Sequence, residues 1–109
     1  MRYAILALTL FIPLSVEAGF FTGRDLLSFC NGSDVQRQLC KGYLMGTADS
    51  MVNPGPAEAN LKVCLPPNIT ADELRSLTIK WFDEHKAELD QTASSAFAQA
   101  LLHTYPCRH

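Results

Sequence analysis

The stretch from residue 69 to residue 82, Ile-Thr-Ala-Asp-Glu-Leu-Arg-Ser-Leu-Thr-Ile-Lys-Trp-Phe, has the clearest helix signal in the chain. Thr70 and Glu73 have the spacing of a capping box, in which each side chain hydrogen-bonds to the backbone of the other residue. Ile69 and Leu74 stand where a hydrophobic staple needs them. Apolar side chains then recur at helical spacing to the end of the stretch. These features predict an amphipathic helix that packs on a core.

Three further segments show helical spacing of apolar residues. They span residues 22–30, residues 33–51, and residues from about 86 to 105. The first two open with the cap spacings of Thr22 with Asp25 and Ser33 with Gln36. The first segment is expected to end at Asn31 and Gly32, which are residues that stop helices.

The second segment carries one further pattern. Its residues that share one helical face are Val35, Leu39, Tyr43, Gly46 and Ser50. Gly42 and Gly46 lie four residues apart, and each glycine costs a helix up to about 1 kcal/mol relative to alanine. This spacing predicts that another backbone approaches closely there.

Residues 53–68 contain four prolines and show no helical period, which predicts a long surface loop. No segment alternates with a period of two, as a half-buried strand would. The expected fold is therefore all-α: a small bundle of four main helices joined by one long proline-rich loop and stapled by two disulfides.

The first eighteen residues have the pattern of a signal peptide. Arg2 precedes a short apolar stretch, and Val16, Glu17 and Ala18 approximate a cleavage site. Cleavage after Ala18 would export residues 19–109 as a single domain. No second apolar run is long enough to cross a bilayer, so no membrane contact is expected after cleavage. Hydrophobic residues make up 48% of the chain and its net charge is −2, which disfavours disorder and nucleic-acid binding.

The four cysteines are expected to form two disulfides, because export places the domain in an oxidising compartment. Four cysteines allow three pairings. Cys40 lies near the start of the second helix, and the chain travels up that helix and returns through the loop before it reaches Cys64. This hairpin favours Cys40 with Cys64. Cys30 would then pair with Cys107 and tie the two ends of the domain together.

Several motifs in a fixed order resemble the Rap/Tai family of immunity proteins of type VI secretion. The motifs are Leu26-Leu27 ahead of Cys30, the block from Cys40 to Gly46 with Asp49 after it, Cys64-Leu65-Pro66, Trp81-Phe82 with His85, and Tyr105-Pro106-Cys107. The resemblance spans residues 22–107. Lys86 follows His85 where family members often have proline, which predicts a fourth helix more continuous with the third than usual.

The resemblance implies a small helical periplasmic protein, often a homodimer, that binds and blocks a peptidoglycan amidase delivered by sister cells. Those amidases have a Cys-His active site, so an inhibitor needs only a surface that covers the substrate groove. No residue spacing in the chain resembles a catalytic or metal-binding constellation. The chain is accordingly expected to be neither an enzyme nor a cofactor or metal protein.

The same resemblance suggests two surfaces for the toxin. The first is the loop of residues 53–62, expected to insert into the toxin, with Asn53, Glu58, Asn60 and Lys62 as contacts. The second is the acidic group of Asp83, Glu84 and Glu88, because carboxylates can meet a basic groove and steer association.

Two alternatives to a toxin inhibitor stay open at this point. A periplasmic chaperone of the acid-stress type is also small, helical and exported, although such chaperones usually have a single disulfide. An orphan binding protein of the same fold would have no cognate toxin.

Overall fold

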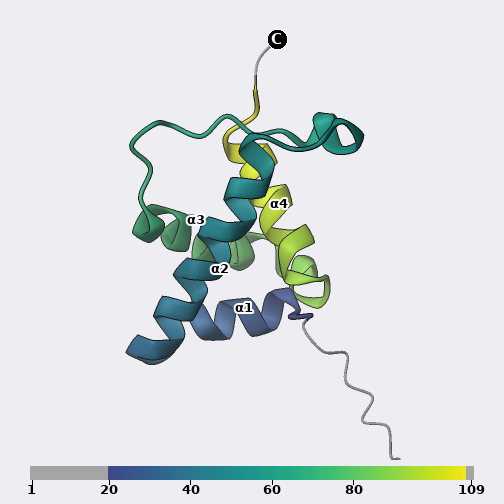
Figure 1. Ribbon diagram of the computed structural model, residues 1–109. Coiled ribbons are helices and arrows are strands. Elements are labelled where there is room, and N and C mark those ends of the chain that lie inside the picture. The colour runs from purple at the N-terminus through teal and green to yellow at the C-terminus, as the bar shows by residue number, and fades with distance from the viewer. Residues whose placement is uncertain (1–19, 108–109) are drawn as a thin grey trace, which may run out of the picture.

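The computed structural model describes residues 20–107, and the predicted leader of residues 1–18 lies outside this range. The described chain forms four α-helices, with two 3-10 segments between them (Figure 1). The elements in order are α1 (Gly23–Cys30), α2 (Asp34–Val52), η2 (Pro56–Leu61), α3 (Ala71–Glu84), η3 (Lys86–Asp90) and α4 (Ala93–Thr104). The all-α prediction is confirmed. No helix in the described range is both long and apolar enough to cross a bilayer.

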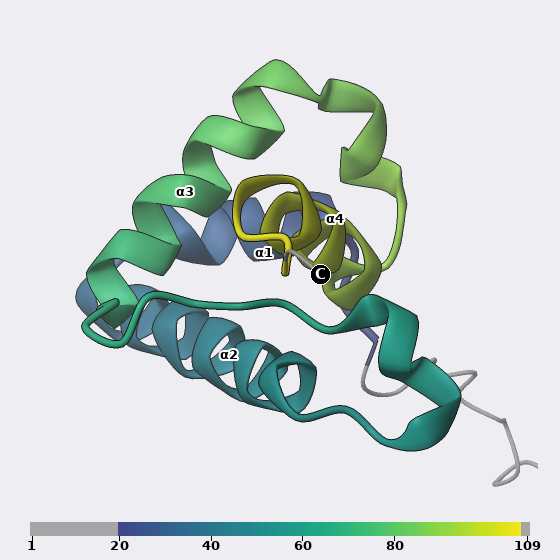
Figure 2. The same cartoon turned by 90° about the horizontal axis from the view of Figure 1, so that it is seen from above.

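Helix α4 lies in the middle of the bundle, and α1, α2, α3 and η3 surround it (Figure 2). Its buried residues are Ala93, Ala96, Phe97, Ala100 and Leu101. The alanines let the neighbouring helices approach, while the two large side chains fill the space between them. The other helices add the rest of one continuous core, which includes Leu26, Leu44, Leu74 and Phe82.

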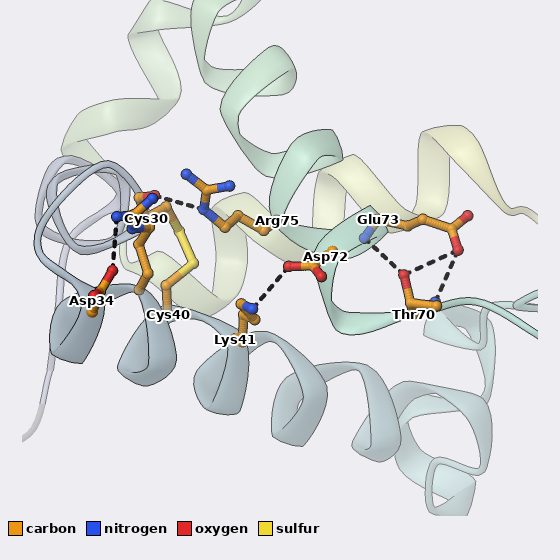
Figure 3. Close-up of polar contacts among 9 residues, drawn as sticks. Cys30, Asp34, Cys40, Lys41, Thr70, Asp72, Glu73 and Arg75 are labelled. Carbon is orange, nitrogen blue, oxygen red and sulfur yellow. Dashed lines mark hydrogen bonds and ion pairs between the residues drawn. A yellow bond between two sulfur atoms is a disulfide. The ribbon is translucent and has the colours of Figure 1, made fainter.

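The capping boxes read from the sequence are present at α1, α2 and α3. At α3, the Thr70 hydroxyl oxygen accepts from the Glu73 N–H at 3.1 Å, and Glu73 Oε1 accepts from the Thr70 N–H at 3.1 Å (Figure 3). Each box satisfies two backbone donors that the first turn of a helix leaves without partners. The starts of α1, α2 and α3 are therefore decided by residues only three positions apart.

The buried face of α2 differs from the face that its apolar spacing suggested. Cys40, Leu44, Ala48 and Met51 are buried, whereas Val35 is 79% exposed and Leu39 is 46% exposed. A Cβ added at Gly42 or Gly46 would meet no atom within 4 Å. The predicted close backbone approach at these glycines is therefore wrong for the described chain, because both lie on the side of α2 that faces away from the core.

The predicted disulfide pairing is also wrong. Cys30 bonds to Cys40, and Cys64 bonds to Cys107, with Cα atoms 5.0 Å apart in each pair. Helix α1 ends at Cys30, and the turn that follows leads directly into α2, so α1 packs against the first turns of α2 (Figure 3). Cys40 is therefore beside Cys30 and is fully buried with it.

The position of Cys64 explains why it pairs with Cys107 and not with Cys40. The N–H of Val63 donates to the carbonyl of Met51 at 3.0 Å, so the loop returns only to the far end of α2. Met51 is eleven residues beyond Cys40, which corresponds to about 16 Å along the helix axis. At that end the Cys64 N–H donates to the Tyr105 carbonyl at 2.9 Å, which places Cys64 next to Cys107.

The passage from α3 to α4 is less continuous than the sequence suggested. His85 has φ −135° and ψ 64° and ends α3. The 3-10 segment η3 follows, and α4 begins only at Ala93, after the cap residue Thr92. The expected start near residue 86 and the expected continuity are both wrong. The N–H of Gly23 donates to the Gln91 carbonyl at 2.8 Å, so the end of this connection is fixed against the start of α1.

Candidate functional site

The predicted inserting loop forms a closed excursion at the end of α2. Asn53 ends the helix, and the hydrogen bond from Val63 to Met51 closes the base of the excursion. Between these points η2 has Pro56 near its start and a non-helical residue, Glu58, at φ −113° and ψ 23°. No residue of η2 is buried. The segment therefore projects from the bundle beside α4 (Figure 1).

A groove of about 550 Å³ lies between this excursion, the C-terminal half of α2 and the first turns of α4. Met51, Leu61 and Ala98 give it apolar surface. Its polar lining comes from Thr47, Ser50, Asn53, Glu58, Ser94 and Ser95. We call this the α2–α4 groove.

The α2–α4 groove has the chemistry of a binding surface. Glu58 is the one ionisable residue among the described residues that line it, and its side chain has no ion pair there. Part of the hydroxyl capacity is already used, since Ser50 donates to the Thr47 carbonyl at 2.7 Å. Apolar surface beside hydroxyls and one carboxylate suits a side chain with an apolar stem and a positive end.

The structure brings only some of the predicted loop contacts to this groove. Asn53 and Glu58 line it, whereas Asn60 and Lys62 are exposed on the excursion outside its lining. The sequence interpretation did not identify Ser94 and Ser95 as site residues. Their only local signal is a pair of hydroxyls just after the cap of α4, and tertiary packing brings that pair against the end of α2.

The second predicted surface is separate from the groove. Asp83 pairs with Lys86 at 3.5 Å and Glu84 pairs with Lys80 at 3.5 Å, so neighbouring lysines offset part of their charge. Glu88 Oε1 is covered by protein atoms, and no described residue hydrogen-bonds to it. The second surface is therefore a mixed-charge surface in which Asp83 and Glu84 remain largely exposed.

Asp83 also lines a pocket of about 470 Å³ between α1, α3 and η3. Leu27, Ile79, Phe82 and Leu89 contribute apolar surface to this pocket. It shares no lining residue with the α2–α4 groove, so the two candidate surfaces do not form one site.

The histidines of the described chain pack against an aromatic side chain. The His85 ring stacks on Trp81 with centroids 3.6 Å apart, and the His103 ring lies 5.4 Å from Trp81. His85 Nδ1 is also 3.0 Å from the Trp81 carbonyl oxygen. Among residues 20–107, no group of three or more histidine, cysteine or acidic side chains is arranged to hold a metal ion.

The chain was compared with known protein families. The family model of the Rap1a immunity proteins matches residues 22–107. This span contains all four helices, both disulfides and the α2–α4 groove. No curated protein and no solved structure gives a significant match.

Proposed function

Because the chain belongs to the Rap1a immunity protein family, we propose that it binds and inhibits a peptidoglycan amidase toxin delivered by type VI secretion. Family membership implies toxin immunity and a cognate toxin as the partner. The amidase and the delivery route are inferred from the sequence motifs. Immunity proteins of this family are typically periplasmic, and we propose that this chain acts there after removal of residues 1–18.

The observation that carries the proposal is the exposed excursion next to the α2–α4 groove. A protein that blocks an enzyme sterically needs an element that projects into the substrate groove and keeps its shape. The excursion projects from the bundle, and no residue of η2 is buried. A hydrogen bond from Val63 to Met51 closes its base. We propose that it occupies the toxin's groove and that Glu58, in the α2–α4 groove, pairs with a basic side chain of the toxin.

Inhibition of this kind requires no reaction by the immunity protein. The excursion excludes substrate, while the α2–α4 groove receives a side chain of the toxin that surrounds it. Glu58 would lose water on binding, so removing either charge of its ion pair would leave the other charge buried without a partner and weaken the complex.

The test is capture of the partner from periplasm with the full chain, followed by an assay of peptidoglycan amide cleavage. An amidase that is captured and inhibited is the expected result. Capture of a toxin with a different activity would contradict the proposed amidase target. Capture of unfolded proteins alone, at acid pH, would contradict toxin inhibition and support the chaperone alternative.

Two charge reversals then test the surface. Glu58→Lys is expected to weaken toxin binding by at least tenfold, the effect of losing about 1.4 kcal/mol. Glu84→Lys is the matched control, because Glu84 is also an exposed carboxylate but lies outside the groove. A larger effect of Glu84→Lys would indicate that the toxin binds the acidic group at the end of α3 instead.

We also propose that the chain forms a homodimer through the solvent-facing side of α2. Val35 and Leu39 are large exposed apolar residues, and Met45 of the same helix is 46% exposed. Gly42 and Gly46 leave open space on the same side. An apolar face with two glycines is suited to close packing against its own copy about a two-fold axis.

Sedimentation equilibrium tests this homodimer. Leu39→Glu is expected to shift the chain to the monomer mass, because it buries a charge in the interface. Leu61→Glu is the matched control, since Leu61 is 39% exposed on the excursion. Wild-type chain that is monomeric at all concentrations, or a Leu39→Glu variant that stays dimeric, would refute the proposed interface.

A further inference from the structure

A second cluster of charged side chains lies at the other end of α2, where α2 meets the start of α3. Arg37 and Lys41 from α2 and Arg75 from α3 line a polar notch of about 160 Å³. Asp34 and Asp72 line it as well. The three cations exceed the two carboxylates, although the whole chain has a net charge of −2. The notch is therefore locally positive on an acidic protein.

The pairing inside the notch leaves hydrogen-bond donors unused. Asp34 accepts from Arg37 Nη2 at 3.0 Å, and Asp72 accepts from Lys41 Nζ at 2.8 Å. Arg75 has no carboxylate partner among the described residues, and its one hydrogen bond runs from Nε to the Cys30 carbonyl at 2.7 Å (Figure 3). Arg37 Nε is covered by protein atoms and has no acceptor in the described chain. The two terminal nitrogens of Arg75 can therefore still donate to a ligand, whereas the covered Arg37 Nε cannot reach one.

Covalent and buried contacts hold the cations in place. The carbonyl that anchors Arg75 belongs to Cys30, and the Cys30–Cys40 disulfide is fully buried. The Lys41 side chain is only 22% exposed. Because the Lys41 and Arg75 side chains are already ordered, they lose little conformational entropy when a ligand binds.

The size of the notch and its hydrogen-bond donors indicate which kind of ligand fits it. Its volume corresponds to roughly five water molecules at about 30 Å³ each, which accommodates a carboxylate or phosphate group but no nucleotide. Arginine forks match the oxygen geometry of these two anions. We propose that the notch binds a small oxyanion, a carboxylate or a phosphate group, through Arg37, Lys41 and Arg75. None of these residues lines the α2–α4 groove, so this inference is independent of the proposed function.

Amide chemical shifts of the full chain test the notch. Sodium acetate, sodium phosphate and sodium chloride are titrated separately at matched ionic strength. Saturable shifts at the amides of Arg37, Lys41 and Arg75 are expected with one or both oxyanions and not with chloride. Saturation by acetate alone identifies a carboxylate ligand, and saturation by phosphate alone identifies a phosphate group. Equal shifts with all three salts would overturn the proposal.

Two variants with opposite expected effects on anion affinity keep the test decisive if one of them does not fold. Arg75→Gln is expected to weaken the saturating anion by about tenfold or more, since it removes charged donors. Asp34→Asn is expected to tighten binding about threefold, because one competing negative charge is lost. Lys80→Gln is the control on the exposed side of α3 and should leave affinity unchanged. Weaker or unaltered binding by Asp34→Asn would overturn the proposal even if Arg75→Gln fails to fold.

Discussion

The N–H of Val63 donates a hydrogen bond to the carbonyl oxygen of Met51 at 3.0 Å. This one contact returns the chain to the last turn of α2 after its excursion through η2. It also brings Cys64 beside Tyr105 and Cys107 at the end of α4. The base of the excursion is therefore held by a backbone hydrogen bond and a disulfide, while η2 stays exposed.

Excision of η2 should separate toxin binding from folding. Replacing residues 55–61 by two glycines removes no buried side chain of η2 and shortens the loop, so the free energy of unfolding should change by less than about 1 kcal/mol. Affinity for the captured toxin should fall by at least tenfold. Urea denaturation and calorimetric titration measure the two effects. Full affinity in a folded excision variant would contradict insertion of this segment.

The two disulfides should differ in their accessibility to reductant. Cys30 and Cys40 are fully buried, whereas Cys64 is exposed. Stepwise reduction and alkylation, read by mass spectrometry, should label Cys64 and Cys107 first. Peptide mapping of the unreduced chain should yield the pairs Cys30–Cys40 and Cys64–Cys107. A peptide that links Cys40 to Cys64 would contradict this connectivity.

Removing each disulfide should lower stability by different amounts. The bonded cysteines are separated by 10 and 43 residues, for which loop-closure entropy predicts about 3 and about 4 kcal/mol. Paired serine variants, Cys30→Ser with Cys40→Ser and Cys64→Ser with Cys107→Ser, measure these values by urea denaturation. A cost near zero for either pair would show that its disulfide does not stabilise the fold.

The caps of α3 and α4 offer a matched pair of threonine substitutions. Thr70 accepts from the Glu73 N–H, whereas the Thr92 side chain makes no cap hydrogen bond to the backbone. Thr70→Ala should lower the free energy of unfolding by about 1 kcal/mol. Thr92→Ala, which loses only a hydroxyl contact to Ser95, should cost less than about 0.5 kcal/mol. Equal costs would show that the box at α3 contributes no special stability.

The ion pair of Lys41 with Asp72 should make stability depend on acid pH. The hydrogen bond from Lys41 lowers the pKa of the Asp72 carboxyl, and the charges of Lys41 and Arg75 lower it further. An ordinary aspartate has a pKa of about 3.9, so the pair stabilises the fold above that pH. Its contribution is lost as pH falls through the lower pKa of the folded state.

The Asp72→Asn variant checks this sign. It should be less stable than wild type near neutral pH and equally stable once the pH lies below the lowered pKa of Asp72. The difference should be small and should shrink in high salt, because the Asp72 side chain is 75% exposed. A difference that grows toward acid pH would contradict the lowered pKa. Thermal unfolding across the pH range supplies the measurement.

The features that could be predicted from the sequence depend on residues a few positions apart. Ser33 with Gln36 and Thr70 with Glu73 specify helix starts through contacts within one turn. The absence of alternating patterns predicts the all-α class in the same local way. These predictions agree with the structure because local spacing determines which backbone groups a side chain can reach.

The features that could not be predicted depend on which surfaces meet. Helix α2 has apolar residues on two sides, and only packing decides that Leu44 is buried while Leu39 is exposed. Local spacing cannot distinguish these sides, because both repeat with the helical period. For the same reason Ser94 and Ser95 become site residues only when α4 packs beside the excursion.

By itself, then, the sequence determined the all-α class, the capped starts of α1, α2 and α3, the exposed loop and the motifs of an immunity family. Each of these follows from neighbouring residues or from their order along the chain. Only the tertiary structure decided that Cys30 pairs with Cys40 and that Cys64 pairs with Cys107. A disulfide requires two Cα atoms within a few ångströms of each other. That proximity was set by the packing of α1 on α2 and by the return of Val63 to Met51.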